Sequence, residues 1–270
     1  PAYLPSAKAE RGMLAQLMSV QGAICREVKD VRLATQVLIG HDPRDPWHVP
    51  MPFSQPGSGL SKIGFSREAH GYPIHEGILA NLDRAASILE GAGYQIEEIE
   101  TPPITEAAKA WLQVTNFEMK KTLEPVFNEH GSEIIKQIFG CYYKLEDMVD
   151  AEGYLFGIAE RTRMVREWNL LLADYPLILT PFLMRPGYTS DFDETFEGVK
   201  DLFDSSIYSY GVNYLGMPAG VVPVDLVDGL PSGIQLIGQK WRENLILDAM
   251  EVIESATGVM TQKLWDRESD

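Results

Sequence analysis

The sequence predicts an α/β fold in which a mixed, largely buried β-sheet is covered by helices on both faces. Two apolar runs, 221–227 and 234–237, flank Asp228-Gly229, a pair that favours a tight hairpin turn. The first run is apolar almost throughout, so both of its faces are expected to be covered, as in the middle of a large sheet. Pro223 has no N–H to donate and therefore requires a bulge or an unpaired edge.

A strand–helix–strand order ahead of the hairpin is the second observation behind this fold class. Residues 62–66 and 94–100 have strand character, and 74–89 form an amphipathic helical pattern. One face of that pattern carries Ile78, Leu82, Ala85 and Leu89. This order is typical of a right-handed crossover between parallel strands. The hairpin therefore adds antiparallel strands to a parallel sheet.

The N-terminal part begins with a polar, irregular segment, residues 1–12. A helix follows, with Val28, Val31, Ala34, Thr35 and Leu38 on one face, and Gly40 is its expected end. Residues 41–47 read as a Pro-rich loop. We interpret residues 1–60, with this helix and loop, as belonging to one domain together with residues 61–270.

The remaining elements follow the same reasoning. Residues 105–140 and 151–173 are expected to be largely helical, and the second stretch places Leu155, Ile158, Val165 and Leu172 on one face. Residues 177–181 form a buried strand that ends at its proline, and 182–193 form a loop. A last helix, starting at 242, presents Ile246, Ala249, Met250 and Ile253 to the sheet.

Composition excludes several classes of function. The chain of 270 residues is 45% hydrophobic, which allows a substantial core, and its net charge of −16 argues against nucleic-acid binding. No stretch approaches the ~20 apolar residues needed to cross a bilayer, and the start has no signal-peptide core. Cys25 and Cys141 are expected to be reduced, buried thiols of a cytoplasmic protein.

Two segments resemble the amidase signature family, serine hydrolases that cleave carboxamides. In 213–238 an Asn, a Gly-Met-Pro-Ala turn, an apolar strand and Gly-Ile-Gln-Leu-Ile-Gly follow in the family's order. Near residue 22 the family carries Gly-Pro-(Leu/Met)-Ala-Arg-(Ser/Thr)-Val-x-Asp. Here Arg26, Val28 and Asp30 match that pattern, whereas Ala23 and Cys25 replace the usual Pro and Ala.

The resemblance implies a serine nucleophile, a second serine in a cis peptide and a lysine base, with the serines in a Gly-Gly-Ser-Ser-Gly-Gly-type segment. No such run occurs in the 270 residues. The only adjacent serines, Ser205-Ser206, have no flanking glycines, and we interpret them with Lys200 as ordinary helix or loop residues. We therefore assign no catalytic residue. The chain is expected to be an incomplete, C-terminal portion of an amidase whose N-terminal segment supplies the reacting groups.

The resemblance also points to substrate-binding residues. In the family, the strand at 177–181 and the loop after it border the substrate cavity, which makes Phe182, Met184 and Tyr188 candidates for apolar contacts. Ser209 and Asn213 are candidates beside them, although Asn213 is equally suited to cap the turn that follows it. These aromatic and aliphatic side chains favour a small-molecule amide with an apolar acyl group.

Other kinds of site find no support. The histidines show no zinc-binding spacing, and His41-Asp42 with His48 is better interpreted as a solvated loop than as a metal site. No cofactor is expected. The hypotheses are an amidase, a non-catalytic remnant that binds or scaffolds, and one component of an amidotransferase. Because a partial domain would expose apolar sheet surface, self-association is expected.

Overall fold

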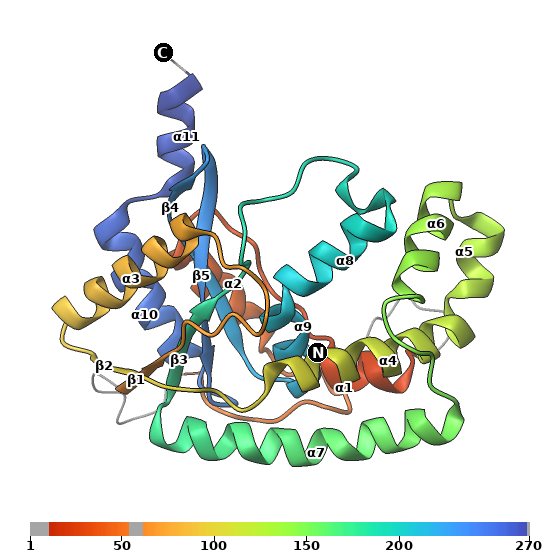
Figure 1. Cartoon of the computed structure of the whole chain (residues 1–270). Coiled ribbons are helices and arrows are strands. Elements are labelled where there is room, and N and C mark those ends of the chain that lie inside the picture. Colours follow the sequence, from red (N-terminus) through yellow and green to blue (C-terminus); the bar gives the residue numbers. More distant parts are fainter. Residues whose placement is uncertain (1–10, 54–61, 269–270) are drawn as a thin grey trace.

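The computed structural model describes residues 11–53 and 62–268, and its centre is a five-stranded mixed sheet (Figure 1). The strand order is β2-β1-β3-β5-β4. The strands β1 (Lys62–Phe65), β2 (Gln95–Glu98) and β3 (Leu177–Pro181) run parallel. The hairpin of β4 (Ala219–Val227) and β5 (Leu230–Gly238) joins β3 in antiparallel pairing. The predicted α/β class with a mixed sheet is confirmed.

Alternation along β3 creates two cores, one on each face of the sheet. Leu177 and Leu179 pack with α3 (Glu76–Gly91) and α10 (Glu243–Thr257). Ile178, between them, points to the opposite face and packs with α4 (Ile104–Thr122), α7 (Ala151–Asp174) and α9 (Ile207–Leu215). Because successive side chains of a strand point to opposite faces, this five-residue buried strand contacts both helical layers.

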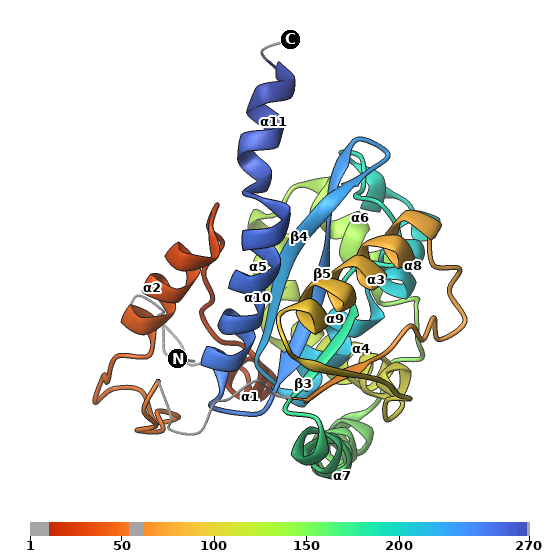
Figure 2. The ribbon, with the colours of Figure 1, turned by 90° about the vertical axis from the view of Figure 1, so that its left-hand side faces the viewer.

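The other helices lie outside these two layers, and the last of them extends away from the rest of the fold (Figure 2). They are α1 (Met13–Met18), α2 (Val28–Leu38), α5 (Glu124–His130), α6 (Glu133–Tyr142), the 3₁₀ turn η1 (Phe192–Glu194), α8 (Phe196–Ser205) and α11 (Met260–Glu268). The helix α2 lies against α10 because Arg32 forms ion pairs of 2.7 Å with Asp248 and with Glu251. Within the described ranges, every helix is too short or too polar to span a membrane.

The hairpin has the predicted turn, but its position in the sheet differs from the prediction. Asp228 and Gly229 have φ angles of +51° and +78°, which suits the Asp-Gly pair, and the register shifts between Pro223 and Asp225. Of the two arrangements predicted for Pro223, a bulge or an unpaired edge, the structure shows a bulge on an edge strand. The expectation that β4 lies in the middle of the sheet is wrong: β4 is an edge strand, and Val221 is 39% exposed. An apolar run indicates a strand, but it does not show whether that strand pairs with other strands on one side or on both.

The stretch 105–140 is largely helical, as predicted, and it consists of three helices, because Pro125 lies in the first turn of α5 and Ser132 caps α6. The prediction for α7 needs a correction. On α7 the buried residues are Met164, Trp168 and Leu172, whereas Leu155 is 63% exposed. Only the C-terminal half of this long helix contributes fully buried side chains, so Leu155 has no core to face.

The parallel crossover β1–α3–β2, the helix α2 and the sheet-covering helix α10 are confirmed. Both cysteines are free thiols, as predicted, and Cys141 is buried. The expectation of a buried Cys25 is wrong, because Cys25 lies exposed in the irregular segment before α2. Most of the polar segment 1–12 lies outside the described residues.

Candidate functional site

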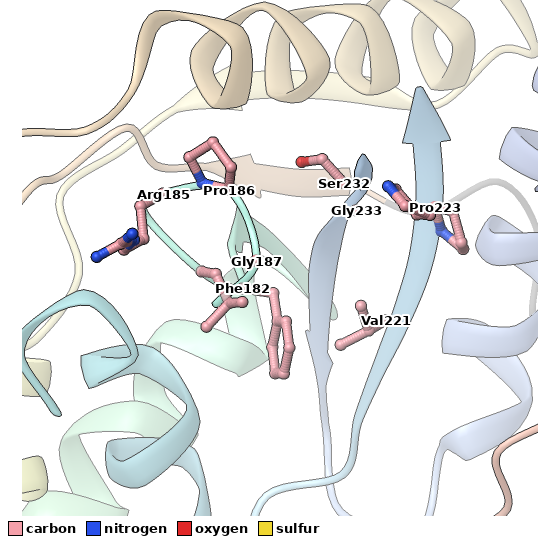
Figure 3. Close-up of a pocket in the computed structure, with 10 residues that line it drawn as sticks. Phe182, Arg185, Pro186, Gly187, Val221, Pro223, Ser232 and Gly233 are labelled. Atoms are coloured by element: carbon pink, nitrogen blue, oxygen red, sulfur yellow. The ribbon is translucent and has the colours of Figure 1, made fainter. Parts of the chain in front are cut away.

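A cavity of about 210 Å³ opens where β3 ends, between the loop that follows β3 and the face of the hairpin (Figure 3). The lining residues are Phe182, Leu183, Arg185, Pro186, Gly187, Val221, Pro223, Pro231, Ser232 and Gly233. The hairpin continues beyond β3, since Pro181 pairs with Ile234 and the residues before Ile234 pair only with β4. In α/β sheets the carboxyl ends of parallel strands are the usual place for ligands.

The side of the cavity that the hairpin forms depends on a β-bulge in one strand and a glycine in the strand paired with it. The bulge after Pro223 tilts the edge strand next to the cavity. Gly233, opposite Pro223, allows a close backbone contact, because a Cβ there would lie 2.5 Å from the carbonyl oxygen of Val222. Any larger residue would push the two strands apart at the cavity wall.

The loop wall is anchored by backbone hydrogen bonds at Met184. Its N–H donates to the carbonyl of Ser205, and its carbonyl accepts from the N–H of His75, both at 2.9 Å. The Met184 side chain is fully buried and packs in the core beneath α8 and α9. It therefore supports the loop from inside, while the neighbouring Phe182 lines the cavity.

Tyr188 fastens the far end of this loop to the junction of α8 and α9. Its hydroxyl lies at hydrogen-bond distance from both Ser205 Oγ and Ser206 Oγ, the latter at 3.2 Å. Its ring packs against Phe192 with the centroids 4.9 Å apart. Tyr188 therefore holds the loop in place and lies outside the set of residues that line the cavity.

A carboxylate on α8 connects the two loops at this edge of the sheet. Asp201 accepts a hydrogen bond of 2.8 Å from the Tyr72 hydroxyl and is paired with the Arg185 guanidinium. The guanidinium carbon also lies 5.1 Å and 4.7 Å from the ring centroids of Tyr188 and Phe192. Burial, and then the hydrogen bond to Asp201, raise the pKa of Tyr72 to about 12, so this hydroxyl stays a donor.

The other two predicted residues, Ser209 and Asn213, lie on α9. Asn213 Oδ1 accepts a 2.6 Å hydrogen bond from the indole N–H of Trp111 on α4. Its Nδ2 donates to the carbonyl of Met18 at 3.3 Å. Both ends of this carboxamide are thus occupied by other parts of the chain. Neither Ser209 nor Asn213 is among the residues that line the cavity, and of the five candidates only Phe182 lines it.

The adjacent serines do not form a catalytic arrangement with Lys200. Lys200 pairs with Asp204, one turn along the same helix. Ser205 is fully buried and donates to the carbonyl of Asp201 at 2.6 Å. These contacts are those of ordinary residues at a helix end. Among the described residues, no three His, Cys, Asp or Glu side chains gather as metal ligands, and Asp42 binds Arg44.

Sequence reasoning missed the hairpin side of the cavity and the pair of Arg185 with Asp201. Val221 was predicted inside a sheet, and only the strand order shows it on an exposed edge. Asp201 is distant in sequence from Tyr72 and Arg185, and no spacing rule connects them. Pro223 and the glycine in the strand paired with it could have indicated this side of the cavity, because a β-bulge often lies next to an active site.

Comparison with known proteins gives a consistent picture. A family model described as Amidase matches residues 2–247. An indoleacetamide hydrolase of Bradyrhizobium japonicum is 36% identical over 98% of this chain and 58% of its own length. A glutamyl-tRNA(Gln) amidotransferase subunit of Clostridium kluyveri is 25% identical over 87% of this chain and 53% of its own length.

The fold has solved relatives as well. The structure of 6-aminohexanoate cyclic dimer hydrolase complexed with substrate superposes with a TM-score of 0.68 and 19% identity, over 86% of this chain and 54% of that one. At this identity the likeness concerns the fold. In each of these comparisons the chain spans between half and three-fifths of the length of the relative it matches.

Proposed function

The chain belongs to the amidase family, and from this premise we propose that it forms part of an enzyme that hydrolyses the C–N bond of a small carboxamide. The products would be a carboxylate and ammonia or an amine. The observation that carries the proposal is the identity of 36% with an indoleacetamide hydrolase across 98% of the chain. That relative's name also supports an amide with an aromatic acyl group.

The cavity at the end of β3 is the proposed binding site for the acyl group. Phe182, Leu183, Val221 and Pro231 give it a mostly apolar wall, which favours the uncharged part of an arylacetamide-like substrate. Phe182 is the proposed contact. We propose that Met184 and Tyr188 act by shaping the loop that carries Phe182.

The reacting groups are proposed to come from polypeptide outside these 270 residues. The sequence contains no Gly-Gly-Ser-Ser run, and Ser205, half of its adjacent serine pair, is buried and hydrogen-bonded within α8. In the complete site a serine would attack the carboxamide carbon and form an acyl-enzyme, which water then hydrolyses. The 270 residues would supply the sheet and one wall of the substrate cavity.

Release of ammonia from phenylacetamide and indole-3-acetamide tests the proposal. The chain is assayed alone and after co-expression with a polypeptide that carries the family's serine-rich segment. We expect binding without turnover for the chain alone, and turnover after co-expression. Turnover by the chain alone would refute the location of the reacting groups. Binding without turnover in both samples would instead indicate a remnant that lost its chemistry.

The second candidate is one component of a multi-subunit amidotransferase, which the likeness to the glutamyl-tRNA(Gln) amidotransferase of Clostridium kluyveri favours. Stable co-purification with other subunits from the native source would support it. We also propose a cytoplasmic location, in keeping with the two unpaired cysteines. Self-association stays a prediction, to be measured by sedimentation.

A further inference from the structure

Arg185 is the one ionisable residue among the ten described residues that line the cavity. Figure 3 shows that the guanidinium is directed away from Phe182 and Val221, toward the outside of the loop. Arg185 therefore belongs to the wall of the cavity, but its positive charge points away from the cavity.

The guanidinium of Arg185 points toward the carboxylate of Asp201. The carboxylate pairs with the Arg185 guanidinium and accepts the Tyr72 hydroxyl, so both of its oxygens are used. The two charged side chains are only 30% and 32% exposed, which makes their pairing stronger than that of a fully solvated pair. The guanidinium also lies near the rings of Tyr188 and Phe192. Neither ring carries a charge that could neutralise the guanidinium.

Resting on the proposed amidase function, we propose that Asp201 determines the specificity of the cavity for uncharged ligands. It neutralises Arg185 and keeps the guanidinium outside the cavity. Without Asp201, a free guanidinium at this wall would attract carboxylates, for which its planar donors are well suited. Asp201 has no contact with the cavity itself, so it acts through Arg185 as a positioning residue.

Two probes of nearly equal shape and different charge test this inference. Phenylacetamide is neutral and phenylacetate is anionic, and their dissociation constants are measured by calorimetry or ligand-observed NMR with the full 270-residue chain. We expect the wild type to prefer phenylacetamide. In Asp201→Asn the ratio of the two constants should move about tenfold toward phenylacetate, the change expected for one charge-assisted hydrogen bond.

Three further variants distinguish an effect of charge from a general loss of structure or stability. Asp201→Glu should keep the wild-type ratio, because the carboxylate is retained. Asp204→Asn is the matched control, since Asp204 lies on the same helix and pairs with Lys200 instead of Arg185. Adding Arg185→Met to Asp201→Asn should cancel the gain in phenylacetate binding, because the cation that causes it is gone.

The outcomes distinguish this inference from the proposed function. If the wild type binds phenylacetamide and the ratio is unchanged in Asp201→Asn, the inference fails and the proposed cavity stands. If the wild type binds neither probe, both fail. Should Asp201→Asn not fold, Asp201→Ser provides a second neutral side chain, and an unchanged ratio there overturns the inference equally.

Discussion

Replacing Asn213 with alanine separates a structural role from a ligand-binding role for this residue. Asn213 is a candidate substrate contact because its segment leads into the turn before the hairpin, and the same position suits a residue that caps this turn. In the structure its carboxamide connects three helices, because it accepts from Trp111 on α4 at 2.6 Å and donates to Met18 on α1 at 3.3 Å. We therefore expect Asn213→Ala to lower the stability of the fold and to leave ligand binding intact.

The expected size of the effect follows from these two contacts. A neutral side-chain hydrogen bond contributes about 1 kcal/mol net, and the longer contact to Met18 contributes less. Asn213 itself is exposed, so water can replace part of what is lost. The free energy of unfolding should fall by about 1–2 kcal/mol, which lowers the midpoint of thermal unfolding by about 2–6 °C in a protein of this size.

Urea unfolding followed by circular dichroism measures the stability, and calorimetry with phenylacetamide measures binding. Asn169→Ala serves as the control, since Asn169 is an exposed asparagine on α7. Its substitution should change the free energy of unfolding by less than about 0.5 kcal/mol. An Asn213→Ala protein with wild-type stability and lost phenylacetamide binding would refute the structural role and restore Asn213 as a substrate contact.

Three further predictions concern the turn before β4, a half-buried histidine and the cavity. Gly216→Ala should cost about 1–2 kcal/mol in urea unfolding, because Gly216 has a φ of +65° and its new Cβ would lie 2.5 Å from Arg161 Nη2. Burial lowers the pKa of His70 below 6.5, so the unfolded chain binds the proton more readily, and the free energy of unfolding should fall as the pH drops through that value. His70→Asn should flatten this decline, and an equally steep decline in that variant would contradict the assignment. Val221→Phe should fill the cavity and weaken phenylacetamide binding by about tenfold while leaving unfolding unchanged, since Val221 is 39% exposed on an edge strand.

The elements that sequence reasoning predicted well are those whose cause is local. Asp228-Gly229 adopts the two positive φ angles that its residue types tolerate, and Pro223 coincides with the bulge that its missing N–H requires. The helix α10 presents the predicted apolar face to the sheet. In each case the deciding interaction lies within a few residues of the chain, so the pattern contains the information.

The candidate site was predictable only in part. The loop after β3 was identified through its resemblance to a family, and Phe182 does line a cavity. The other side of that cavity depends on β4 being an edge strand, which is set by the pairing of distant segments. The side chain of Met184 packs fully buried in the core, because the direction of a loop side chain depends on what lies beneath the loop. Its contact with substrate stays a prediction.

The sequence by itself determined the class of the fold, the hairpin with its turn and bulge, and the resemblance to carboxamide hydrolases. Those features follow from backbone preferences and from the periodicity of apolar residues, which act over short distances. Only the tertiary structure decided which strand lies at the edge, which residues line the cavity, and that Asp201 holds the charge of Arg185 outside it. These depend on contacts between residues far apart in the chain, whose geometry exists only after the sheet and its two helical layers have assembled.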